Sequence, residues 1–82
     1  MSGHRVKEVR FRVYPQDHEP RHVHGFIGNG EVIVDLRADG TVALANRKYA
    51  VVKANASEVR KVLAAAEAAF EELADSWKDM HK

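Results

Sequence analysis

Short runs in the first half of the chain alternate apolar with polar residues, which is the pattern of half-buried β-strands. The extended runs cover residues 8–14, 22–27, 31–36 and 41–45. Two prolines, at positions 15 and 20, bracket a polar loop after the first run. We expect Asn29-Gly30 and Ala38-Asp39-Gly40 to be the turns that join the later runs into a meander. Residues 49–53 suit either a fifth strand or an irregular connection.

From Asn55 onward the spacing between apolar residues changes to three and four, which predicts a helix. The apolar positions are Val59, Val62, Leu63, Ala66, Phe70, Leu73 and Trp77. Asn55 followed three residues later by Glu58 has the form of a capping box. The helix would run for about 26 residues, or ~39 Å. A strand of about six residues spans only ~20 Å, so the last helical turns must overhang the sheet or bend around it.

These elements predict an α+β fold in one domain, residues 1–82. An antiparallel meander sheet of four to five strands packs one face against one long C-terminal helix. The opposite face of the sheet stays open. Trp77 and Met80 lie on the overhanging end of the helix, where we expect a contact with a second copy or with a partner protein. The alternative for Trp77 is that it caps the edge of a small core.

Composition narrows the classes of function. The sequence has no cysteine, which excludes disulfides, thiolate metal sites and a cysteine nucleophile. Its 13 basic and 12 acidic residues leave a net charge of +1, so the whole protein has no strong attraction for nucleic acid or for membranes. No apolar run approaches the roughly 20 residues of a membrane span, and the first residues lack the apolar stretch of a signal peptide. We therefore expect a cytoplasmic protein.

Three of the five histidines fall within seven residues, at positions 18, 22 and 24. Residues two apart on a strand share one face, so His22 and His24 form a pair. If Asn29-Gly30 is a two-residue turn, His24 lies opposite Asp35. Both histidines then point to the open face, and Val23 points to the core.

This cluster has three interpretations. The first is a site for a divalent metal, zinc or similar, held by His18, His22, His24 and Asp35. The second is acid–base catalysis on a phosphodiester by His22, His24 and Asp35, with Arg21 or the arginines of the first strand, Arg10 and Arg12, stabilising the phosphate. The third is an ordinary cross-strand pair of His24 and Asp35 on a solvated sheet face.

The segment Asp17-His18-Glu19-Pro20-Arg21-His22-Val23-His24 resembles the Asp-His-x-Pro-x-His-x-His signature of a family of small bacterial proteins, domain of unknown function 4160. The later Glu71-Glu72-Leu73 before Trp77 is similar to that family's closing helix. The resemblance runs from about Phe11 to Trp77. It implies a component of a small two-gene module of toxin–antitoxin type, beside another small domain, and it implies no particular activity.

Two functions of different classes are consistent with these patterns. The first is a non-catalytic component of a bacterial regulatory or toxin–antitoxin-type module, which binds a small companion protein or forms a homodimer. The alternative is a small histidine-based phosphodiesterase or ribonuclease, with or without a metal. Arg10 and Arg12 alternate outward on the first strand, so a single strand of nucleic acid could follow this face with weak affinity. No membrane contact is expected.

Overall fold

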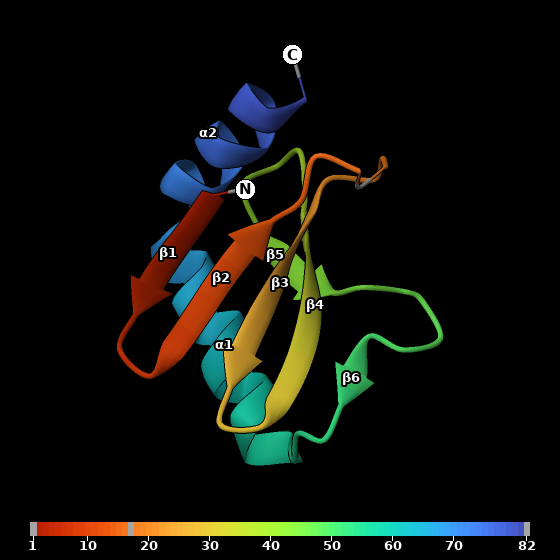
Figure 1. The fold of residues 1–82 in the computed structure, drawn as a ribbon, viewed down its shortest axis with the longest axis vertical. Coiled ribbons are helices and arrows are strands. Elements are labelled where there is room, and N and C mark those ends of the chain that lie inside the picture. Colours follow the sequence, from red (N-terminus) through yellow and green to blue (C-terminus); the bar gives the residue numbers. More distant parts are fainter. Residues whose placement is uncertain (1, 17, 82) are drawn as a thin grey trace.

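The computed structural model describes residues 2–16 and 18–81, in which six strands precede two helices (Figure 1). The strands are β1 (Ser2–Val6), β2 (Val9–Val13), β3 (His22–Ile27), β4 (Gly30–Leu36), β5 (Val42–Leu44) and β6 (Val51–Val52). The helices are α1 (Ala56–Ala68) and α2 (Phe70–Met80). The strands form one antiparallel sheet in the order β1-β2-β3-β4-β5, and β6 pairs with β4. This confirms the predicted α+β meander.

The sequence predicted four to five strands, and the described sheet has six. β1 precedes the first predicted strand and pairs with β2 from Ser2↔Val13 to Val6↔Val9. A hydrogen bond between His4 Nε2 and Ser76 Oγ also joins β1 to α2. The segment 49–53, for which the sequence left two alternatives, contains the short strand β6.

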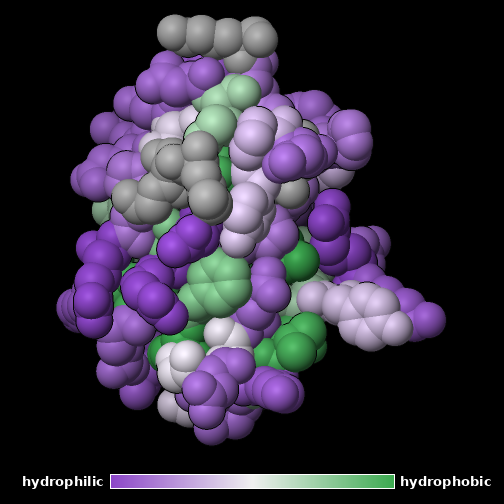
Figure 2. All heavy atoms as spheres, viewed as in Figure 1, coloured by the Kyte–Doolittle hydropathy of each residue, from purple (hydrophilic) through white to green (hydrophobic). Residues whose placement is uncertain are grey.

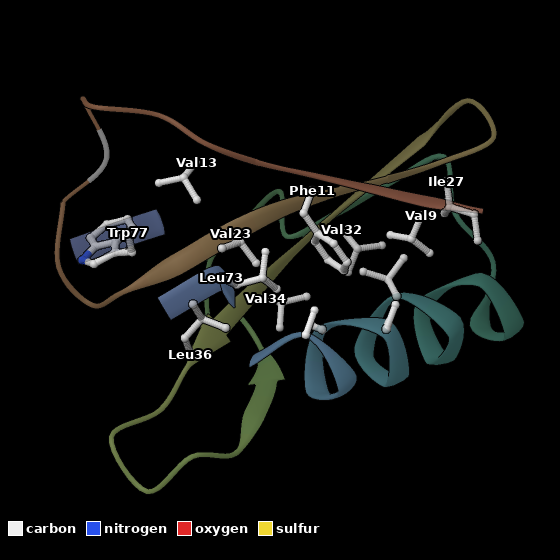
Figure 3. Packing of buried hydrophobic residues seen from close by; sticks show 14 residues of the cluster. Val9, Phe11, Val13, Val23, Ile27, Val32, Val34, Leu36, Leu73 and Trp77 are labelled. Carbon is white, nitrogen blue, oxygen red and sulfur yellow. The ribbon is translucent and has the colours of Figure 1, made fainter. Parts of the chain in front are cut away.

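The inward-facing residues of β2, β3 and β4 pack against the helices and form the main core (Figure 3). The sheet contributes Val9, Phe11, Val13, Val23, Ile27, Val32, Val34 and Leu36. The helices and the residue between them, Ala69, contribute Val62, Ala65, Ala66, Ala69, Leu73 and Trp77. Both helices lie behind the sheet in the view of Figure 1, so the face turned toward the reader has no helix on it.

The turn between β3 and β4 differs from the predicted one by one residue. Ile27 pairs with Gly30, so Gly28 and Asn29 form the turn in place of Asn29-Gly30. Gly28 has a φ of +56°, as expected for glycine at the first central position of a type II′ turn. Gly30 is needed inside the strand, because a Cβ there would lie 2.4 Å from the Lys53 carbonyl oxygen. The register therefore shifts by two residues and places His22, in place of His24, opposite Asp35.

The predicted single helix bends at Ala69, where φ is −107° and ψ is 20°. The Ala69 N–H donates to the Ala65 carbonyl at 3.1 Å, and the Leu73 N–H donates to the Ala69 carbonyl at 3.0 Å, so the hydrogen-bond ladder crosses the bend. The bend keeps Leu73 and Trp77 in the core. A straight helix of that length would carry both side chains past the end of the strands, so burial of apolar surface explains the bend.

Along the described ranges 2–16 and 18–81, no helix is long and apolar enough to cross a membrane.

Candidate functional site

His24 and Glu31 form a hydrogen-bonded pair on the open face of the sheet. The His24 Nδ1 lies 2.8 Å from Glu31 Oε2. Because a carboxylate only accepts, the Nδ1–H of His24 is the donor in this pair. The sequence predicted Asp35 as the carboxylate opposite His24, and that prediction is wrong because of the two-residue shift in register. Glu31 was missed, although its position four residues before Asp35 places both on the same face of β4.

His22 is buried, with an exposed fraction of 1%, and its surroundings are aromatic. Its Nδ1–H donates to the Pro20 carbonyl at 2.8 Å. The centroid of its ring lies 5.4 Å from that of His24 and 5.3 Å from that of Trp77. The two histidines are therefore neighbours, as predicted. His22 is buried beside Trp77 of α2, whereas His24 is near the open face.

Trp77 belongs to the core and does not project from an overhang. Its exposed fraction is 5%, and its ring stacks on His81 with 3.7 Å between centroids. Met80 is half-buried and packs against the core. Of the two alternatives drawn from the sequence, this placement agrees with Trp77 as the cap of a small core, and it leaves little of the indole for a partner to contact.

An open groove of about 1390 Å³ lies between α2, the 18–21 loop and the β4–β5 hairpin. His18, Asp35, Trp77, Lys78 and His81 contribute to its lining. Acidic and basic side chains both line the groove, so its charge favours neither an anionic nor a cationic ligand.

Arg21 links two segments that line this groove, the 18–21 loop and the β4–β5 hairpin. Its Nε donates to the Leu36 carbonyl at 3.1 Å, and its Nη2 donates to the Arg37 carbonyl at 3.2 Å. The guanidinium carbon also lies 5.5 Å from the centroid of the Phe70 ring. These contacts occupy two donors of the guanidinium and tie the loop to the hairpin, so they support a structural role for Arg21.

The predicted metal ligands do not converge on one point, although His22 lies opposite Asp35 and beside His24. His18 is exposed on the loop and Asp35 is half-buried beside the groove, whereas His24 is engaged with Glu31. Asp17, which precedes His18 in the signature segment, lies outside the described residues. Within the part of the chain that the structure describes, no three His, Asp or Glu side chains are placed to hold one metal ion. The geometry gives the metal hypothesis no support.

Comparison with known proteins matches the chain to a protein family. The model of the family described as Domain of unknown function (DUF4160) covers residues 9–78. The chain belongs to this family. No curated protein and no solved structure matches it.

The DUF4160 chain has a second surface, which lies outside the histidine motif. In the described residues, the exposed large hydrophobic side chains all lie between positions 44 and 52: Leu44, Tyr49, Val51 and Val52. We call this set the apolar edge, because β5 and β6 end the sheet on the side of β4. In Figure 2 hydrophobic atoms come to the surface over β6, next to the hydrophilic 46–48 connection. The Tyr49 side chain is 68% exposed.

The charged side chains of the 44–53 segment are all basic, and Glu31 of β4 lies opposite Val52. Arg47, Lys48 and Lys53 are exposed there, and the sequence has no acidic residue between Asp39 and Glu58. Lys48 Nζ lies 5.6 Å from the centroid of the Tyr49 ring, a cation–π distance. The run of basic residues without acidic ones was visible in the sequence, but only the fold shows that the intervening apolar side chains are exposed.

Proposed function

We propose that this DUF4160 chain is a non-catalytic, partner-binding component of a bacterial regulatory or toxin–antitoxin-type module, acts in the cytoplasm, and binds its companion protein through the apolar edge. The observation that carries the proposal is the concentration of exposed large hydrophobic side chains between Leu44 and Val52. Exposed apolar residues that occur singly are ordinary, whereas several of them along one edge of a sheet are typical of an interaction surface.

The backbone of this edge suits pairing with a strand of the partner. β6 has two residues, Val51 and Val52, and pairs with β4 on one side. A partner segment in extended conformation could add to the sheet there, since edge strands offer main-chain hydrogen bonds and alternate side-chain contacts. Tyr49, at the end of the neighbouring connection, supplies the large aromatic surface that anchors many interfaces.

The charges specify the chemistry of the companion. Arg47, Lys48 and Lys53 flank the apolar edge without an acidic neighbour in sequence. The complementary surface is an apolar strand or helix bordered by Asp and Glu. A second copy of this chain is the competing occupant, because the exposed side of α2 carries Glu71, Glu72 and Asp79.

The proposal is tested by co-expressing the chain with the small protein encoded by the adjacent gene and measuring the affinity of the purified pair by calorimetry. We expect Val51→Thr with Val52→Thr to weaken binding, since threonine keeps the β-branched shape and removes apolar surface. We expect Arg47→Glu with Lys48→Glu to weaken it further. Arg60→Glu, an exposed position on α1, is the matched control and should bind as the parent does.

Two results would contradict the proposal. One is a complex whose affinity is unchanged by all four edge substitutions. The other is a chain that forms a homodimer through this edge in sedimentation experiments and leaves no surface for the companion.

A second candidate function is metal-independent cleavage of phosphodiesters, and the His24–Glu31 pair is the observation that favours it. A histidine whose Nδ1–H is held by a carboxylate has the arrangement of a general base. Incubating the chain with single-stranded RNA in a chelator tests it. Cleavage that is lost in His24→Ala and kept in His18→Ala would support this function, and equal cleavage by both variants would reject it.

A further inference from the structure

We propose that the open face of the sheet over β1, β2 and β3 binds single-stranded nucleic acid, with Arg5, Arg10 and Arg12 on the phosphates and with Tyr14 and Phe26 against the bases. This surface is separate from the apolar edge, which lies beyond β4, and the inference does not depend on the companion protein.

The register of the sheet aligns these side chains in two rows. In the first row Arg5 pairs with Arg10, and Arg10 pairs with Phe26. In the second row Arg12 pairs with His24. Neighbouring strands are about 4.8 Å apart, and rows two residues apart are separated by about 7 Å. Three guanidinium groups therefore occupy one continuous area at the β1–β2 side of the sheet.

The outward side chains of β1 and β2 give this area a positive charge. Arg5, Arg10 and Arg12 are exposed, and the outward positions of β1 and β2 carry no Asp or Glu within the described residues. The nearest outward carboxylate along the first row is Glu31 on β4, which is hydrogen-bonded to His24. Figure 2 shows mainly hydrophilic atoms over β1 and β2 on this face. A local positive area can bind phosphates although the net charge of the chain is only +1.

Aromatic rings adjoin the arginines on the β3 side. Phe26 and Tyr14 are both half-buried, so each residue is partly open to solvent. The Tyr14 ring contacts His24 edge-on, with 4.9 Å between centroids. Rings fixed in this way provide stacking surfaces for bases at a small cost in side-chain entropy.

These features favour a single strand over a duplex and over a protein ligand. Stacking on a protein ring requires bases that are not stacked in a helix. A duplex offers its phosphates but not its base faces, and an acidic peptide offers carboxylates without rings that need stacking surfaces. The combination of guanidinium groups and open rings matches a polymer that carries phosphates and bases together.

The test uses fluorescence anisotropy with labelled oligouridine and oligothymidine of about 12 nucleotides. We expect binding whose affinity falls with salt, with a slope of log K against log salt of about −2 for three phosphate contacts. Arg5→Ala with Arg10→Ala should weaken binding at least about tenfold and reduce the magnitude of the slope by about 1.4. Arg60→Ala removes an exposed arginine from the helical side and should have almost no effect. Phe26→Leu keeps the apolar bulk and should weaken binding without changing the slope.

Circular dichroism of each variant shows whether it is folded, and the exposed positions of Arg5 and Arg10 make folding the expected result. Tighter binding of oligouridine than of oligothymidine would identify the ligand as RNA. Equal affinities would show that the surface recognises the phosphates and the base faces of either polymer. Both results would support the inference. Affinity that is independent of salt, or an equal loss in Arg60→Ala, would overturn the inference. It would also be overturned if an acidic heptapeptide competed with the oligonucleotide while a duplex of the same length did not.

Discussion

The packing of α1 against β3 gives a prediction whose size follows from the structure. A Cβ added at Gly25 would lie 2.6 Å from Val62 Cγ1 and 3.0 Å from Phe11 Cε1. Both neighbours are fully buried, so neither can move into solvent. Gly25→Ala is therefore an overpacking substitution, and we expect it to lower the free energy of unfolding by about 1–3 kcal/mol.

Val62→Ala removes the atom that causes the closest contact. Alone it deletes two buried methyl groups and should cost about 2 kcal/mol, including the residual cavity. In the double variant the alanine at position 25 enters the space that the valine has left. We expect the double variant to lose about 2 kcal/mol, where independent effects of the two substitutions would add to about 4 kcal/mol.

Urea unfolding measures these differences, because the sole tryptophan, Trp77, is buried and its fluorescence reports unfolding. Gly30→Ala is the matched control. Its added Cβ would lie 2.4 Å from a backbone atom, the Lys53 carbonyl oxygen, so Lys53→Ala gives no relief. Losses that simply add for Gly25 and Val62, or a Gly25→Ala variant as stable as the parent, would refute the close packing of α1 on β3.

The remaining predictions concern single sites. His22→Ala should lower the free energy of unfolding by about 2–4 kcal/mol, because it empties a buried aromatic site, whereas His18→Ala on the exposed loop should change it by less than about 0.5 kcal/mol in urea unfolding. Asn55→Ala should cost about 1 kcal/mol in the same assay, since Asn55 caps α1. The hydrogen bonds from Thr41 hold the pKa of Asp39 below its ordinary value, so their contribution to stability is present above the ordinary pKa and is lost as pH falls through the lowered one. NMR titration of the Asp39 carboxyl in the parent and in Thr41→Val checks this, and an unchanged midpoint in the variant would contradict it.

Much of the fold could be predicted because burial imposes a period on the sequence. The core-facing residues of β2, β3 and β4 recur at every second position, and the apolar positions after Asn55 recur at helical spacing. β1 could not be predicted in this way, since within Ser2–Val6 only Val6 is a large apolar residue. That strand forms through its backbone pairing with β2 and the contact between His4 and Ser76, and neither leaves an apolar pattern.

For the histidine motif, the sequence predicted the shared face of the sheet and not the residue pairs, and it did not predict the apolar edge. The alternation correctly placed His24 and Asp35 on one face, but the register depended on which of two glycines formed the turn. Gly28 and Gly30 are equivalent in a local pattern, and only the approach of the Lys53 carbonyl to Gly30 distinguishes them. Long-range contacts of this kind also bury Trp77, which the local pattern left at the end of a helix.

The most direct test of the proposed partner-binding function is to map the contact on the chain itself. The unlabelled companion protein is titrated into the ¹⁵N-labelled chain, and amide shifts are followed by NMR. The account predicts that the largest changes fall on residues 44–53, with smaller ones along the paired part of β4. Changes confined to the end of α2 near Trp77 and Met80, with the 44–53 amides unmoved, would contradict it.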